Sequence, residues 1–122
     1  MGVTKFEDLH VWQRSLQIAV KIYQLVQLNR DFGFKDQIQR AVTSISNNIA
    51  EGFDRGSDRD FKRFLFIALA SASEVRSLVH LGRELGYLDH ESHKLLEKEL
   101  IEIRYMINGL SKTLTRTSVK KL

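Results

Sequence analysis

The chain has 122 residues, which suits one domain and is too short for two of ordinary size. It has no cysteine, which excludes a disulfide framework, a thiolate metal site and a cysteine nucleophile, and no proline, which favours long uninterrupted helices. The net charge of +4, from 19 basic and 15 acidic residues, is compatible with nucleic-acid binding but does not establish it.

The N-terminal residues carry no targeting signal. Residues 1–5 lack the apolar stretch of a signal peptide, and Phe6 stands where a myristoylation pattern needs a hydroxyl. The apolar runs further along the chain, such as residues 64–70, are too short to span a bilayer. We therefore expect a cytoplasmic protein that does not enter a membrane.

Apolar residues recur at steps of three and four in four segments. The recurring residues of the first segment are Leu9, Trp12, Leu16, Ala19, Tyr23 and Val26. The later segments contain Ile38, Val42, Ile45 and Ile49; Phe61, Leu65, Ala68, Ala72, Val75, Val79 and Gly82; and Leu96, Leu100, Ile103, Ile107, Leu110 and Leu114. Such spacing places side chains on one stripe of an α-helix, whereas strands alternate. The pattern predicts helices at about residues 5–28, 34–53, 58–85 and 89–116.

Turn and capping residues agree with these segments. Thr4 and Ser57 each precede an acidic residue at capping-box spacing, Gly86 can end the third helix in the left-handed conformation, and Asp89 can cap the fourth helix. Short loops favour antiparallel neighbours. We predict one all-α domain over residues 1–122, an antiparallel up-down-up-down four-helix bundle.

The second segment carries a polar stripe with three possible roles. Gln37, Ala41, Ser44, Asn48 and Glu51 fall on one helix face. They could form a solvated face, a polar network that fixes helix register or a subunit contact, or a catalytic carboxamide–carboxylate pair at Asn48 and Glu51. Small residues here would also let a neighbouring helix approach closely.

Three stretches carry a family resemblance. They are Phe6–Gln13, Gln37–Phe53 and Arg63–Glu74, and the most specific part is the Ser-Ile-x-x-Asn-Ile-Ala-Glu-Gly run at Ser44–Gly52. Over about residues 6–115 the chain resembles the bacterial four-helix bundle family first met as proteins encoded in intervening sequences of large-subunit ribosomal RNA genes. It departs from the family pattern in lacking proline in the first interhelical loop and after the Ser-Ile pair.

This resemblance implies a small four-helix bundle that assembles as a cyclic homo-oligomer, with a pentamer favoured. A related branch is the accessory variability protein of diversity-generating retroelements, a basic pentamer that binds nucleic acid and a reverse transcriptase. The resemblance implies no enzymatic activity for the family, and it does not by itself transfer the retroelement role to this chain.

The sequence gives little support for catalysis, a cofactor or a metal. A di-metal bundle needs Glu-x-x-His on each of two helices, and only Glu7-x-x-His10 is present. His90 and His93 are three residues apart, but we interpret them as exposed residues near a helix start. The glycine-containing loop at residues 52–57 lacks the lysine of a phosphate-binding loop. We expect no enzyme, no cofactor and no metal site.

The basic residues form three groups. Arg55, Arg59, Lys62 and Arg63 surround the second loop, where Asp54, Asp58 and Asp60 offset much of their charge. Arg76, His80 and Arg83 form a stripe on the third helix, and an acid-free C-terminal end carries Lys112, Arg116, Lys120 and Lys121. Each group could be a solvated face or a nucleic-acid contact, and a ring would repeat it into a multivalent surface. We expect no aromatic platform for stacking bases, because Trp12 and Tyr23 belong to the predicted core stripe.

Three functions remain open. The first is a non-enzymatic oligomer that binds the backbone of RNA or DNA through the first two basic groups. The second is a structural adaptor that binds another protein and has no nucleic-acid role. The third is an enzyme with a site between subunits around Asn48 and Glu51. We favour the first, with the adaptor as the alternative.

Overall fold

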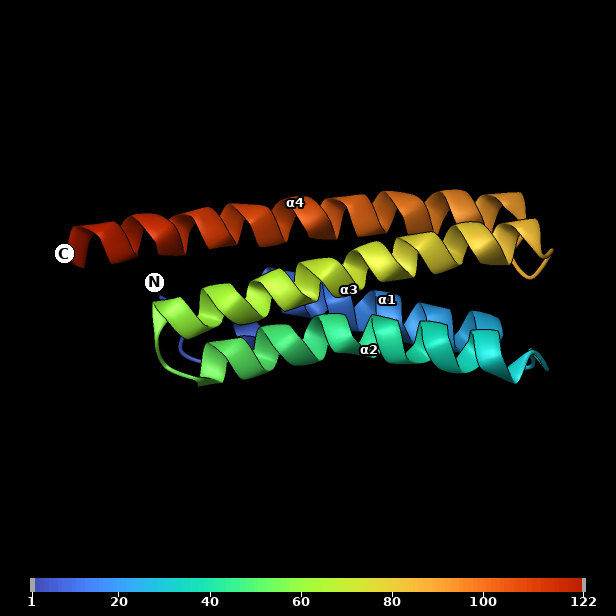
Figure 1. The fold of residues 1–122 in the computed structure, drawn as a ribbon, viewed down its shortest axis with the longest axis horizontal. Coiled ribbons are helices and arrows are strands. Elements are labelled where there is room, and N and C mark those ends of the chain that lie inside the picture. The colour runs from blue at the N-terminus through green and yellow to red at the C-terminus, as the bar shows by residue number, and fades with distance from the viewer. Residues whose placement is uncertain (1, 122) are drawn as a thin grey trace.

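The computed structural model describes the backbone of residues 2–121 and the side chains of residues 2–114. This part of the chain is all-α, as predicted, and forms four α-helices and one short 3-10 helix without any strand. The elements are η1 (Phe6–Asp8), α1 (His10–Val26), α2 (Phe32–Asp54), α3 (Asp58–Glu84) and α4 (His90–Lys121). Consecutive α-helices pack together, and α1 also packs on α4. The α1–α2 and α3–α4 loops lie at the right-hand end of Figure 1 and the α2–α3 loop at the left-hand end.

Local sequence fixes three of the helix ends as predicted. The Ser57 hydroxyl accepts from the Asp60 N–H at 3.2 Å at the start of α3, and the Asp89 carboxylate accepts from the Ser92 N–H at 2.7 Å at the start of α4. Gly86 follows α3 with a φ of 78°. Its N–H donates to Arg83 at 3.1 Å while the next N–H donates to Gly82 at 2.8 Å, which is the Schellman arrangement.

The predicted start of the first helix is wrong. We expected it at residue 5 with a capping box from Thr4, but α1 begins at His10 and Leu9 occupies its N-cap without a side-chain hydrogen bond. Leu9 is buried in an extended conformation, and Phe6 packs edge-on against Trp12 with ring centroids 5.2 Å apart. Burial of Leu9 in the core therefore interrupts the helix between η1 and α1.

The predicted core stripe of the first helix is correct at Leu9, Ala19 and Val26, which are buried, and wrong in its remaining positions. Leu16 and Tyr23 are 43% and 42% exposed, and Trp12 is half-buried. The buried stripe consists of Val11, Ser15, Ile18, Ala19, Ile22 and Val26. The Ser15 hydroxyl reaches this core because it donates to the Val11 carbonyl at 2.7 Å. The segment is apolar on two adjacent faces, and packing buries the face of Ile18 and Ile22 and leaves that of Leu16, Val20 and Tyr23 partly exposed.

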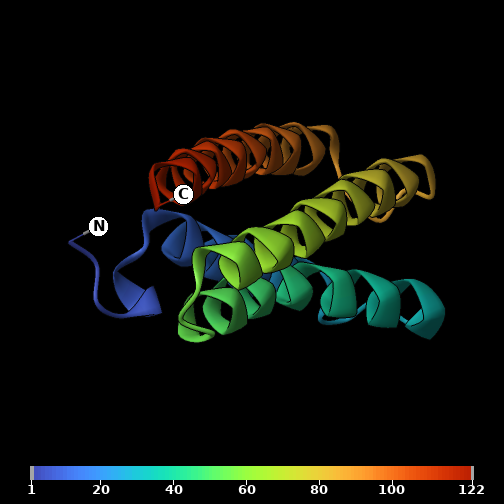
Figure 2. The same cartoon turned by 60° about the vertical axis from the view of Figure 1, so that its left-hand side comes forward.

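The core lies along the inner faces of all four α-helices. Every predicted apolar position of the second and third segments is buried, as are those of the fourth apart from half-buried Leu110. By length and composition α3 is apolar enough to cross a membrane, unlike the expectation from the sequence. In this fold, however, α3 packs against both α2 and α4. In both views α3 and α4 lie closest at their shared loop and separate towards the start of α3 (Figures 1 and 2).

Candidate nucleic-acid interface

The stripe of Arg76, His80 and Arg83 is largely engaged in contacts within the protein. The Arg76 guanidinium donates to Oε1 of Glu97 on α4 at 2.8 Å, and His80 Nε2 lies 2.9 Å from Oε2 of the same carboxylate. The hydrogen bond from Arg76 is the main cause that lowers the pKa of Glu97 below its usual value. Arg83 donates to the Leu88 carbonyl at 3.3 Å. The stripe therefore offers less free positive charge than its sequence indicates.

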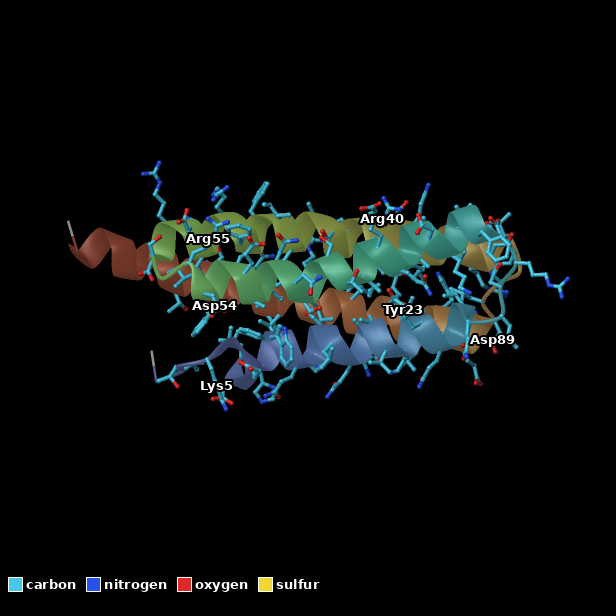
Figure 3. The ribbon with its side chains drawn as sticks, turned by 90° about the horizontal axis from the view of Figure 1, so that it is seen from below. Lys5, Tyr23, Arg40, Asp54, Arg55 and Asp89 are labelled. Atoms are coloured by element: carbon cyan, nitrogen blue, oxygen red, sulfur yellow. The ribbon has the colours of Figure 1, made fainter. Side chains whose placement is uncertain are left out.

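The basic residues at the α2–α3 corner divide into two pairs. Arg55 and Arg63 make exposed ion pairs with Glu51 and Asp60 at 3.1 and 3.4 Å. Both guanidinium groups also lie about 5 Å from the centre of the Phe64 ring, at 5.0 and 4.9 Å. Figure 3 shows Arg55 at this corner, at the end of the molecule opposite Asp89.

Arg59 and Lys62 are the second pair at this corner. Both are exposed, and neither makes an ion pair with any residue whose side chain is described. They project beside the start of α3, where this helix and α4 separate. These two cations are therefore available to a ligand without first breaking an internal salt bridge.

A groove of about 730 Å³ lies between the first half of α3 and the second half of α4. Its apolar lining comes from both helices, and Arg59, Lys62 and Arg63 provide the basic groups around it. The full lining is Arg59, Lys62, Arg63, Leu65, Phe66, Ile67, Leu69, Ile107, Asn108 and Ser111. Small residues, by contrast, lie in the contact of α3 with α2, where Ser44 meets Ser71 and Gly52 meets Phe64.

A second recess of about 280 Å³ continues along the same face. It is lined by Arg76, Ile101, Arg104, Tyr105 and Asn108, so Asn108 joins it to the groove. The side chain of Arg104 is exposed and makes no ion pair within the described part of the chain.

Two exposed aromatic rings lie on this face, contrary to our expectation. Phe66 and Tyr105 are each 73% exposed, and they line the groove and the second recess respectively. Aromatic rings among cations can stack nucleic-acid bases irrespective of sequence. The sequence does not reveal this pair of rings, because they lie 39 positions apart in the chain, on different helices. Only the packing of α3 on α4 brings them to one surface.

Lys112 extends this basic face towards the C-terminus. It is exposed, lies one turn along α4 from Asn108, and makes no ion pair among the described side chains. The side chains of Arg116, Lys120 and Lys121, which we grouped with Lys112 from the sequence, lie outside the described residues.

The polar stripe on α2 divides into a network and two outlying residues. Ser44 Oγ lies 2.8 Å from Ser71 Oγ on α3, and the Asn48 amide donates to Ser44 Oγ at 2.9 Å and to its carbonyl at 2.7 Å. Glu51 pairs with Arg55, and Gln37 lies in an open polar recess that also includes Ser44. Asn48 and Glu51 therefore have different partners: Asn48 bonds to Ser44 within α2, and Ser44 in turn joins α2 to α3 through Ser71.

The fold and this face together define a small all-α four-helix protein with a basic, partly aromatic groove. The family model described as 23S rRNA-intervening sequence protein matches residues 7–109. The chain therefore belongs to this family, which confirms the resemblance found in the sequence.

A solved structure supports the assignment. It is a 1.70 Å crystal structure of a protein of unknown function from the S23 ribosomal protein family of Bacteroides thetaiotaomicron VPI-5482. This chain is similar to it at 31% identity with a TM-score of 0.78, over 84% of this chain and 98% of the other. No protein with a curated function matches the chain.

Proposed function

We propose that the protein is a non-enzymatic module that binds the backbone of single-stranded RNA along the α3–α4 face. The observation that carries this proposal is the groove whose basic residues include Arg59 and Lys62, which make no ion pair with any described side chain. Its apolar lining and the exposed ring of Phe66 suit bases stacked beside a phosphate backbone. The family description refers to 23S rRNA, which makes RNA the first ligand to test.

The proposal includes assembly of the antiparallel bundle as a cyclic homo-oligomer, with five copies favoured by the family resemblance. The second apolar stripe of α1 supports a subunit contact, because Leu16, Val20 and Tyr23 are 43%, 50% and 42% exposed at helical spacing. A ring would present the basic groove once per copy and strengthen binding through multivalency. We place this role in the cytoplasm, without a catalytic step.

Fluorescence anisotropy of labelled single-stranded RNA, single-stranded DNA and duplex DNA tests the proposal. We expect RNA affinity to fall by orders of magnitude between about 50 and 200 mM salt, because bound phosphates release counterions. Light scattering on the same sample gives the number of chains per particle.

The decisive variant is Arg59→Glu/Lys62→Glu, compared with Arg30→Glu/Lys94→Glu. Both variants change the net charge equally. Arg30 and Lys94 are exposed, and they belong to the α1–α2 loop and the first turns of α4, at the end of the bundle opposite the α2–α3 loop (Figure 1). We expect the first variant to lose about tenfold or more in affinity and to flatten the salt dependence, while the second changes little. Equal losses, or no salt-dependent binding, would contradict the proposal.

The adaptor alternative is favoured by one observation, the apolar character of the groove lining. An adaptor predicts a protein ligand whose binding is insensitive to Arg59→Glu/Lys62→Glu but is lost in Phe66→Ala. The adaptor function would be supported if the intact protein binds no nucleic acid and if its binding to a captured protein partner survives Arg59→Glu/Lys62→Glu but is lost in Phe66→Ala.

A further inference from the structure

A histidine-rich cluster joins α3 to α4 near their shared loop, away from the groove. His80 comes from the last turns of α3, while His93 and Glu97 lie one turn apart on α4. His80 Nδ1 lies 3.0 Å from His93 Nε2, and Glu97 Oε2 lies 2.9 Å from His80 Nε2 and 3.7 Å from His93 Nε2. One potential ligand atom from each residue falls within 4.8 Å of the other two.

We propose that His80, His93 and Glu97 bind a borderline divalent transition-metal ion of the Zn²⁺ type. Two imidazole nitrogens and one carboxylate oxygen are the donor set that such ions prefer when no thiolate is present. Two nitrogens bound to one ion at about 2.1 Å stand roughly 3.0–3.4 Å apart, which fits the separation of His80 Nδ1 and His93 Nε2. Glu97 Oε2 contacts the other ring nitrogen of His80, so a rotation of the His80 ring or of the carboxylate is needed to bring all three donors onto one ion.

The surroundings of the cluster also suit such an ion. Arg76 holds Oε1 of Glu97 at 2.8 Å, which orients the carboxylate and leaves Oε2 directed towards the histidines. His93 and Glu97 are mostly buried, with side chains 22% and 23% exposed, while His80 is 52% exposed. The ion can therefore enter past His80, and water can complete its coordination.

The two histidines that are closest in the sequence are not the two that meet in the structure. His90 and His93 are neighbours in the chain, but His90 is exposed and is not part of the cluster. His80 and His93 lie in different helices and meet only because Gly86 turns the chain back at the end of α3. The ion would consequently link α3 to α4 across this turn and stabilise the folded state. This inference does not depend on nucleic-acid binding.

Isothermal titration of tag-free, full-length protein with ZnCl₂ in a non-coordinating buffer tests the site. We expect saturable binding of one ion per chain, and a Tm that rises by about 5 °C or more near 100-fold excess over Kd. Co²⁺ in place of Zn²⁺ should give visible absorption bands from a nitrogen and oxygen ligand set. No saturable binding at metal concentrations on the order of 1 mM would overturn the proposal.

Single histidine variants locate the site. His80→Gln and His93→Gln should each weaken binding by about tenfold or more and abolish the Tm shift, since even outer contacts of metal sites cost this much. His90→Gln and His10→Gln are matched controls that should retain wild-type binding. Circular dichroism of each variant verifies folding. Three results would each show that this cluster is not the site: unchanged metal binding in His80→Gln and His93→Gln, loss of metal binding in either control variant, or a stoichiometry of one ion per two chains.

Discussion

The two sides of α3 are built from different residues, and they differ in how closely the neighbouring helix approaches. On the α2 side, a Cβ added at Gly52 would lie 2.5 Å from Phe64 Cβ, and Ser44 meets Ser71 at 2.8 Å. On the α4 side, bulky apolar and basic residues border a groove of about 730 Å³. Small residues let the backbones of α2 and α3 come close at these two points. The face between α3 and α4 instead presents an apolar and basic groove that a ligand can enter.

Two phenylalanines of α3 give the largest expected contrast. Phe64 is 7% exposed and packs on Gly52, whereas Phe66 is 73% exposed in the groove. Phe64→Ala should lower the free energy of unfolding by about 3–5 kcal/mol, because it leaves a cavity. Phe66→Ala should change it by less than about 0.5 kcal/mol. Urea unfolding of both variants measures the difference, and similar losses would show that the two sides are equally packed.

Two glycines test the close approach of α2 and α3. At Gly52 an added methyl group would collide with Phe64, whereas at Gly109 in α4 it would meet no atom within 4 Å. Gly52→Ala should destabilise the protein, because overpacking costs about 1–3 kcal/mol and exceeds the gain in helix propensity. Gly109→Ala should raise stability by up to about 1 kcal/mol. Thermal unfolding should therefore give Tm shifts of opposite sign. A stabilised Gly52→Ala variant would contradict the tight contact.

Two serines of α3 give the smallest effect. Ser71 is buried and bonded to Ser44, while Ser73 is exposed. Ser71→Ala should cost about 1 kcal/mol through the lost interhelical hydrogen bond, and Ser73→Ala less than about 0.5 kcal/mol. Guanidinium titration can resolve this difference when both variants are measured together with the parent protein. Equal stability of the two variants would show that the hydrogen bond between Ser44 and Ser71 does not stabilise the α2–α3 contact.

Much of the fold could be predicted from the sequence, but the first helix could not. The stripes predicted in the second, third and fourth segments lie on the buried faces of their helices, although α3 also exposes Phe66, Ile67 and Leu81. The first segment has two apolar faces, with Leu16 and Tyr23 on one and Ile18 and Ile22 on the other. Periodicity detects both stripes equally, and only the position of the neighbouring helices decides which one is buried.

The basic residues of the candidate site could be predicted from the sequence, but which of them form ion pairs within the protein could not. Arg59 and Lys62 were named from the sequence, as was the Arg76 stripe. The sequence did not show that Glu97, 21 residues further along, would pair with Arg76, or that Phe66 and Tyr105 would share one face. Each of these facts depends on which turns of α3 and α4 lie side by side.

The sequence by itself determined that this protein is helical and where most of its helices begin and end. Apolar spacing, the absence of proline, the caps at Ser57 and Asp89 and the left-handed turn at Gly86 are all local features. The tertiary structure alone decided which face of α1 is buried, which basic side chains pair with a carboxylate on another helix and which histidines meet. Those outcomes depend on contacts between residues far apart in the chain, whose register is set by packing.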